Sequence, residues 1–259
     1  MDANKTPATI LQKVSLPTGF LSLLAIWWLI TASFDIPLSV LPSPADAVIA
    51  LLESKGVFRS LGVTIQTTLI ALLVSVVAGV AIALLLHRWL LLQPLVLPLL
   101  VTLQVTPVIV LAPVVVVVAP PGLTQVIVAF LVAFFPITVS TLQGLKSTPS
   151  VLLDAMRIYP VSRWQTFCYL RWPFALPFFF SGLRTAVGLA LVGAVIADMM
   201  TGRGGQYSGI GMRIQIALQG NIRLVFGEAL LVTAVGILLI EAVEMMSKLT
   251  LGQWRRNDG

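Results

Sequence analysis

Residues 89–145 decide the fold class. They read WLLLQPLVLPLLVTLQVTPVIVLAPVVVVVAPPGLTQVIVAFLVAFFPITVSTLQGL, a run of 57 positions without a charged side chain. A transmembrane helix needs about 20 apolar residues, so the run is too long for one span and predicts two. We place the break at Ala119-Pro120-Pro121-Gly122, because adjacent prolines and a glycine form a strong turn signal.

The composition of the whole chain agrees with this prediction. Of 259 residues, 58% are hydrophobic and 10% are charged. Soluble domains average about 25% charged residues, and large apolar patches facing water drive association. Disordered chains are polar and charged. The composition therefore excludes both classes and predicts an all-α, polytopic membrane protein, because only helices and closed barrels span a bilayer.

Four further charge-poor stretches each predict one more span, so that we expect six transmembrane helices in a single domain over residues 1–259. We place the spans at about 14–34, 62–86, 90–118, 123–142, 174–200 and 224–246. The first span is longer than the apolar part of a secretory signal, and no A-x-A-like site follows it, so we expect a retained helix. Residues 147–172 form the one long loop on the side of the N-terminus.

The distribution of Lys and Arg predicts that both termini are cytoplasmic, because cytoplasmic segments carry an excess of these residues. Ten basic residues then lie inside and five outside. The inner residues are Lys5, Lys13, Arg88, Lys146, Arg157, Arg163, Arg171, Lys248, Arg255 and Arg256, and the outer residues are Lys55, Arg59, Arg203, Arg213 and Arg223.

The rare residue types exclude most chemistry. Cys168 and His87 are the only cysteine and histidine, so neither a disulfide within the chain nor a zinc site with two histidines can form. No lysine directly follows a glycine, so the nucleotide-binding pattern GxxxxGK[ST] is absent. We expect no catalytic residue, no metal and no cofactor in this chain; if ATP is used, another chain binds it.

Two outer segments are longer than a turn. Ser43 can cap a helix that begins at Pro44, and Asp46 completes a capping-box-like pattern at the start of an amphipathic stretch over residues 45–58. Residues 201–223 predict a bent loop followed by a short helix that does not cross the membrane.

The long inner loop reads as two short amphipathic helices. Apolar residues recur at helical spacing before Pro160, which ends the first helix, and Ser162 can cap the second. The apolar positions are Val151, Leu152, Ala155, Met156 and Tyr159. These residues alone leave two alternatives open: a loop resting on lipid headgroups, or a docking element for a soluble partner.

This loop resembles the EAA loop of permease subunits of ATP-binding-cassette importers. That pattern is E-A-A, three residues, G, nine residues, I-x-L-P, and here Asp154-Ala155-Met156, Pro160 and Leu170-x-Trp172-Pro173 stand at the same spacings. The run Ser162-Arg163-Trp164 also matches common members. The departures are Asp for Glu, Met for Ala, Pro for Gly and Trp for Leu. Because glycine permits positive φ and proline fixes φ near −65°, we expect a different turn at the bend.

Further motifs along the chain resemble nitrate/sulfonate/taurine-type permeases in order and spacing. They are Leu41-Pro42-Ser43-Pro44, Pro107, Ala112-Pro113, Phe134-Phe135-Pro136, Ala175-Leu176-Pro177, Ser181-Gly182-Leu183-Arg184 and Gly209-Ile210-Gly211.

The resemblance implies a multi-pass subunit of a bacterial-type inner membrane. Its implied partners are a second permease copy, two ATPase subunits that hold ATP and Mg²⁺, and an extracytoplasmic substrate-binding protein, with no nucleic acid. Asp154, Ala155, Met156, Pro160, Ser162, Arg163 and Trp164 would couple the permease to the ATPase. Within this set we expect Ala155 and Met156 to pack into a cleft of the ATPase, with Asp154 and Arg163 at its rim.

Six positions are candidates for the pathway, and two for an ion pair. Gln104, Thr106 and Pro107 lie in a span that we expect to bend, because a proline leaves a carbonyl that only protein or a water-filled cavity can satisfy. The other pathway candidates are Phe134 (a constriction or plain core), Gly188 in a small-residue stripe (helix packing or pathway) and Asp198 (a gate or the membrane interface). Arg184 is expected to pair with Glu241, because ionisable residues at membrane depth are usually paired.

The solute stays open. Arg203, Arg213 and Arg223 suggest a basic outer mouth that favours an anion such as nitrate, bicarbonate or a sulfonate, although contact with an acidic binding protein or with lipid explains them as well. The runs Leu170–Pro173 and Phe179–Arg184 also resemble permeases for thiamine-precursor pyrimidines or riboflavin. A secondary transporter that needs no ATPase and a membrane scaffold are the rival classes.

Overall fold

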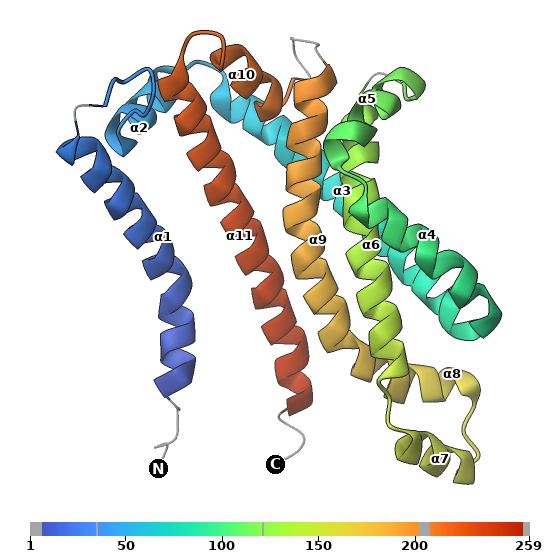
Figure 1. Ribbon diagram of the computed structural model, residues 1–259. Helices are drawn as coiled ribbons and strands as arrows, with labels where there is room; N and C mark the ends of the chain where they lie inside the picture. The colour runs from blue at the N-terminus through green and yellow to red at the C-terminus, as the bar shows by residue number, and fades with distance from the viewer. Residues whose placement is uncertain (1–6, 35, 121, 202–207, 256–259) are drawn as a thin grey trace. The chain divides into compact units, whose positions relative to one another are not determined.

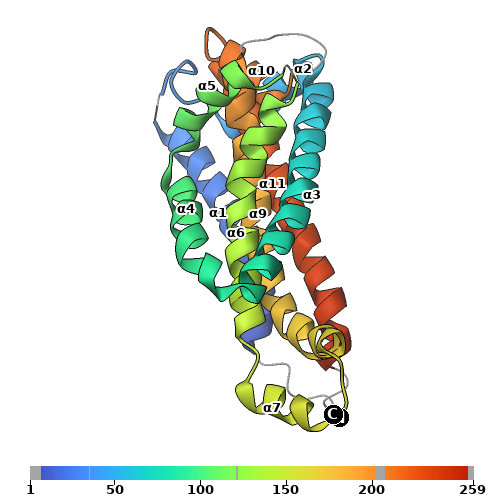
Figure 2. The same cartoon turned by 90° about the vertical axis from the view of Figure 1, so that its right-hand side faces the viewer.

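The computed structural model describes residues 7–34, 36–120, 122–201 and 208–255, with side chains described between residues 19 and 252. These residues form helices joined by loops, with no strand in the described ranges (Figures 1 and 2). The helices are α1 (Pro7–Ser33), α2 (Pro44–Glu53), α3 (Val57–Arg88), η1 (Leu90–Leu92), α4 (Gln93–Val105), α5 (Val108–Val118), α6 (Thr124–Lys146), α7 (Ser150–Ile158), α8 (Arg163–Thr166), η2 (Phe167–Arg171), α9 (Trp172–Thr201), α10 (Ile210–Ala217) and α11 (Ile222–Arg255).

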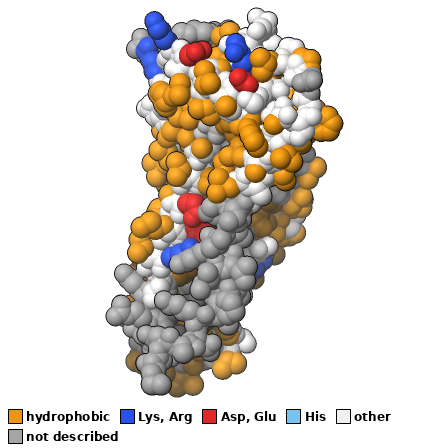
Figure 3. All heavy atoms as spheres, turned by 90° about the vertical axis from the view of Figure 1, so that its left-hand side faces the viewer, with side chains coloured by type: hydrophobic (Ala, Val, Ile, Leu, Met, Phe, Trp, Pro, Cys, Tyr) orange, Lys and Arg blue, Asp and Glu red, His pale blue; other side chains and the backbone are white. Residues whose placement is uncertain are grey.

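Length and composition identify four helices that can cross a membrane: α3, α6, the continuous helix through α8, η2 and α9, and α11. A fifth candidate is the broken pair α4 and α5, and within α1 the fully described part, Gly19–Ser33, is a shorter apolar helix. Large apolar side chains are exposed on the spans, as a lipid-facing surface requires (Figure 3). The all-α membrane class is confirmed, and the sixth span stays a prediction.

The third predicted span is two helices rather than one. The axes of α4 and α5 differ by 100° across the break between them. Thr106 ends α4 with an extended backbone (φ −67°, ψ 122°). Pro107 follows it and has no N–H with which to continue the helix, which explains the position of the break.

The chain forms two compact units, residues 1–57 with 214–231 and residues 58–213 with 232–259. In the first unit the indole N–H of Trp27 donates to the carbonyl of Pro42 at 3.1 Å. The Trp27 ring centroid lies 5.5 Å from that of Phe226, so α1 packs on the start of α11.

The predicted cap of α2 is confirmed. The Asp46 N–H donates to Ser43 Oγ at 3.2 Å, and the Ser43 N–H donates to the Asp46 carboxylate at 3.2 Å. Pro44 occupies the first helical turn, where a missing N–H costs nothing.

The second unit is built on α6 and α9, which lie side by side and run in opposite directions in both views (Figures 1 and 2). Glycines allow the close approach: a Cβ at Gly182 would lie 2.7 Å from the Pro136 carbonyl oxygen, and one at Gly193 would lie 3.0 Å from Ala129 Cα. Gly188, on the same helix, has nothing within 4 Å of its Cβ position. The small residues of α9 therefore do pack against a neighbouring helix of the same chain, but Gly188 does not.

Candidate functional site

Of the two short helices that the sequence predicts in the loop between α6 and α9, α7 is a separate helix, whereas α8 begins after Ser162 as predicted but continues without a break through η2 into α9. Ser162 Oγ accepts the Gln165 N–H at 3.1 Å, and Gln165 Oε1 accepts the Ser162 N–H at 2.7 Å. The predicted cap is confirmed, and the reciprocal bond makes it a full capping box. This second bond fixes the start of α8 although α8 is only one turn long.

The bend between α7 and α8 is made without a positive φ angle. Tyr159 is extended (φ −93°, ψ 151°), and the Val161 N–H donates to the Tyr159 carbonyl at 2.7 Å. That bond closes a three-residue turn with Pro160 at its centre, where the φ angle fixed by the proline ring fits. The expected change of turn at this position is therefore observed, and its geometry is the one proline favours.

The loop exposes large apolar side chains. Val151 is 74% exposed, Ile158 82% and Trp164 71%. Ala155 is also exposed, and Met156 is half-buried. Ile158 is not among the apolar positions expected from the sequence, although it stands seven residues after Val151 and so shares its helix face.

The polar candidates of the loop lie beside this apolar surface. The Asp154 carboxylate accepts a hydrogen bond from Arg157 Nη1 at 2.8 Å. Both side chains are well exposed, so the pair contributes little stability by itself. Arg163 is exposed at the first turn of α8.

A row of aromatic rings joins the loop to α9. Ring centroids lie 5.6 Å apart between Trp164 and Phe167, and 6.1 Å apart between Phe167 and Trp172. The row continues from Trp172 to Phe179 at 6.1 Å. These distances are those of favourable aromatic pairs, so the rings form a continuous row from α8 to the second turn of α9.

The pathway candidates of the broken third span lie at its break. Gln104 and Pro107 are exposed, and Thr106 is half-buried. The Thr102 carbonyl in the last turn of α4 accepts both the Thr106 N–H, at 3.1 Å, and the Thr106 hydroxyl, at 2.8 Å.

Phe134 and Gly188 lie on the central pair of helices. Phe134 is half-buried, with its ring centroid 5.4 Å from that of Phe130, whereas Phe135 is buried. Gly188, itself half-buried, belongs to a face of α9 that repeats at helical spacing and is largely exposed among the described residues. This face comprises Ser181, Thr185, Gly188 and Val192.

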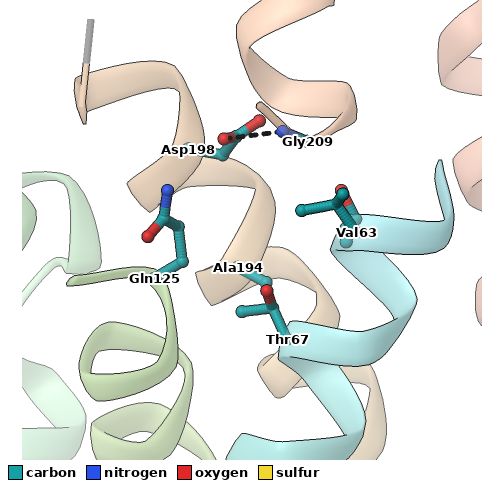
Figure 4. Close-up of a pocket in the computed structure, with 7 residues that line it drawn as sticks. Val63, Thr67, Gln125, Ala194, Asp198 and Gly209 are labelled. Atoms are coloured by element: carbon teal, nitrogen blue, oxygen red, sulfur yellow. Dashed lines mark hydrogen bonds between the residues drawn. The ribbon is translucent and has the colours of Figure 1, made fainter. Parts of the chain in front are cut away.

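Asp198 is buried at the end of α9 and accepts hydrogen bonds from two backbone amides, of which Figure 4 shows the one from Gly209. The amides are those of Gly209, at 3.0 Å, and Met212, at 2.8 Å. Thr64 Oγ1 of α3 accepts the Ile210 N–H at 2.9 Å. Asp198 and Thr64 thus hold the first turn of α10, a role that neither the gate nor the interface alternative included.

A cavity of about 10 Å³ lies beside this carboxylate. Thr67 of α3 and Gln125 of α6 line it together with Asp198 (Figure 4). The volume is about that needed for one water molecule, and the lining offers polar partners for it.

The predicted Arg184–Glu241 ion pair is wrong. Arg184 Nη1 lies 3.5 Å from Glu244 Oε2. Glu244 also accepts a bond from Lys248 Nζ at 2.6 Å, so it is shared between two cations. Glu241 and Glu244 are less than one helical turn apart, about 4.5 Å along the axis, and the packing of α9 on α11 determines which one faces the arginine.

Of the three arginines that predict a basic outer mouth, two lie in the part of the chain that the structure describes. Arg203 lies outside the described residues. Arg213 belongs to the second unit and Arg223 to the first. Of the inner basic residues, Lys5 and Arg256 also lie outside the described ranges.

Comparison with known proteins identifies the family. Residues 75–247 match the family described as "Binding-protein-dependent transport system inner membrane component". The formylaminopyrimidine transport permease protein ThiX of Halalkalibacterium halodurans is 33% identical over 244 residues, 93% of this chain and 96% of that protein. The nitrate import permease protein NrtB of Leptolyngbya laminosa is 26% identical over 203 residues, 75% and 73% of the two chains.

A third relative matches along part of its length. The riboflavin transport system permease protein RibX of Chloroflexus aurantiacus is 37% identical over 131 residues, 50% of this chain and 47% of that protein. All three relatives are named as transport permeases rather than enzymes. The chain therefore belongs to the family of binding-protein-dependent transport system inner membrane components, the permease subunits of ATP-binding-cassette importers.

Proposed function

We propose that α7 and α8 form the element through which an ATPase subunit drives this permease. The supporting observation is the apolar surface of the loop, where Val151, Ile158 and Trp164 are all more than 70% exposed. Burial of such side chains against a partner is favourable by roughly 25 cal/mol per Å² of apolar area. The complete machine would contain two permease copies, two ATPase chains that hold ATP and Mg²⁺, and a binding protein on the outer side.

Movement of the loop would reach the membrane part through the aromatic row. Trp164 lies on the loop and Phe179 lies two turns into α9, with two rings in contact between them. Aromatic rings are stiff and have few rotamers, so they pass on a displacement better than long flexible side chains do. In this arrangement Ala155 and Met156 enter the partner, and Asp154, Arg163 and the Pro160 turn fix the direction of α8.

Photo-crosslinking tests the coupling proposal on this chain. Cys168 is the only cysteine, so Cys168→Ser gives a background on which a single new thiol carries a maleimide–benzophenone probe. Ile158→Cys should crosslink an ATPase chain in native membranes. Leu91→Cys is the matched control, because Leu91 is 88% exposed but lies outside the loop. Equal labelling of the ATPase from both positions, or none from Ile158→Cys, would contradict the proposal.

We propose that the largely exposed face of α9 lines the solute pathway, together with the break between α4 and α5. The face carries Ser181, Thr185 and Gly188. These residues are small and uncharged, so they leave room for a passing solute and do not bind it tightly. Gln104, Thr106 and Pro107 lie where the helix is interrupted, and irregular backbone at membrane depth is tolerated only against protein or water. Phe134 would narrow this pathway from α6, and Asp198 would hold its outer end closed.

For the solute we propose an aromatic heterocycle of the pyrimidine or flavin class. The support is the match along 96% of a formylaminopyrimidine permease and the partial match to a riboflavin permease. A nitrate-type anion is the second candidate, because the nitrate permease matches over 75% of this chain.

Uptake of labelled solutes distinguishes the two solute classes. Cells that carry the full transporter are given radiolabelled pyrimidine, riboflavin or nitrate, with a deletion of this chain as the control. Uptake of a heterocycle that is lost in the deletion strain supports the proposal. Loss of nitrate uptake alone would replace it with the anion.

A further inference from the structure

Cationic side chains gather at the loop end of α3. His87 and Arg88 end α3, Lys146 ends α6, and Arg171 ends η2. All four belong to the second unit. The Arg171 guanidinium contacts His87 Nε2, which brings η2 against the last turn of α3.

A buried glutamine holds Lys146 in the same cluster. Lys146 Nζ donates to Gln93 Oε1 at 2.5 Å, and Gln93 Nε2 donates to the Leu86 carbonyl at 2.8 Å. Leu86 immediately precedes His87, so the ammonium group is fixed beside the C-terminal turn of α3. Arg88 is exposed on that turn.

In the described part of the chain, the ion pairs within 4 Å do not include Arg88, Lys146 or Arg171. Asp154 is used by Arg157, and Glu244 is shared by Arg184 and Lys248. The C-termini of α3 and α6 supply about half a negative charge each, against three permanent cations on Arg88, Lys146 and Arg171. The cluster therefore keeps a net positive charge that attracts an anion.

The surroundings of the cluster are apolar and face outward. Trp89 is 55% exposed, Leu90 67% and Leu91 88%, and they directly follow Arg88. Trp is enriched where a protein passes from lipid hydrocarbon to headgroups. The basic cluster matches the negatively charged headgroup of a phospholipid, and the exposed tryptophan and leucine side chains beside it match the apolar acyl chains.

We propose that Arg88, Lys146 and Arg171 bind the phosphate group of an anionic phospholipid. The guanidinium and ammonium groups would donate charge-assisted hydrogen bonds to phosphate oxygens, while an acyl chain lies along Trp89 and Leu91. The site does not depend on which solute is transported, nor on docking of an ATPase. Inorganic phosphate shares the charge of the headgroup but cannot use the apolar surface.

Native mass spectrometry of the full transporter in detergent tests the site. The complex is titrated with phosphatidylglycerol and, separately, with phosphatidylcholine. The wild type should prefer phosphatidylglycerol, and each removed cation should weaken that preference about fivefold. Arg88→Gln is the first variant, because Arg88 is exposed and its loss leaves the packing intact, and Lys146→Gln/Arg171→Gln should have the larger effect.

The control is Lys248→Gln, which removes one cation from α11 outside the cluster and should leave the preference unchanged. Equal retention of both lipids by the wild type overturns the proposal, as does a preference that Arg88→Gln and the double variant leave unchanged. Leu91→Ser should weaken phosphatidylglycerol binding. If inorganic phosphate displaces the lipid headgroup equally well in the wild type and in Leu91→Ser, a soluble phosphate rather than a phospholipid occupies the cluster.

Discussion

The α7–α8 loop and the α6–α9 pair use apolar residues in opposite ways. In the α6–α9 pair, glycines such as Gly182 bring two backbones together, and the contact is satisfied within the chain. In the loop, side chains as large as Ile158 and Trp164 stay exposed. The loop has a capped second helix and a defined bend, but its apolar surface stays exposed among the residues that the structure describes. One region is therefore a finished core, and we propose that the other is half of an interface.

Breaking the finished core should have the largest effect on stability. Gly182→Ala places a Cβ 2.7 Å from the Pro136 carbonyl oxygen and 2.7 Å from Ser140 Cβ, so a backbone must shift. We expect a loss of roughly 3 kcal/mol and a clear fall of the thermal midpoint in detergent. Gly188→Ala is the matched control: its Cβ meets open space, and alanine favours the helix. Equal midpoints for the two variants would mean that α6 and α9 are not packed as described.

Removing the Asp198 carboxylate, which holds the start of α10, should have the second-largest effect on stability. Asp198→Ala leaves the amides of Gly209 and Met212 without their acceptor, at a cost of about 2 kcal/mol. Hydrogen exchange at residues 209–213 should rise, whereas exchange in α7 should not change. Asp198→Asn keeps one acceptor oxygen and should lose less; a larger loss from Asn than from Ala would refute the capping role.

Removing the cap of the loop should have a smaller effect, confined to the loop. Ser162→Ala deletes the acceptor of the Gln165 N–H and should cost α8 about 1 kcal/mol. Hydrogen exchange should rise at Gln165 and Thr166 while the thermal midpoint of the whole protein stays constant. Ser162→Asp preserves a capping oxygen and should restore protection. A fall in the global midpoint would show that the loop is part of the core.

Breaking the ion pair between α9 and α11 should have the smallest effect on stability. Arg184 and Glu244 are partly exposed, and such pairs contribute about 0.5 kcal/mol. Glu244→Gln should lower the thermal midpoint slightly, and Glu241→Gln should leave it unchanged. If the two results are reversed, the side chain facing Arg184 is Glu241 after all.

The local features of both regions could be predicted from sequence. Uncharged runs predict the spans, Ser43 and Ser162 predict caps, and Pro160 predicts the bend, because each signal acts over only a few residues. The contacts that join distant segments could not be predicted. The Ile210 N–H meets Thr64 across 146 residues, and no pattern in the sequence gives that pairing.

The error over Glu241 has the same cause. A helix face holds residues three or four apart, so Glu241 and Glu244 look equivalent in the sequence. The register of α11 on α9 depends on side chains such as Val243 and Leu183, which pack in the same core cluster. The charge of Asp198 marks it in the sequence, but its partners Gly209 and Met212 depend on where the start of α10 lies in the fold.

The central claim is that the α7–α8 loop is half of an interface with an ATPase, and Ala155→Arg tests it most directly. Ala155 is exposed, so the substitution should leave the thermal midpoint unchanged while placing a large charged side chain on the docking surface. The transporter is purified gently from native membranes, and every chain that comes with it is identified. The account predicts that an ATPase accompanies the wild type and is lost from Ala155→Arg. An ATPase that stays with the variant, or one that never accompanies the wild type even with ATP present, would contradict the account.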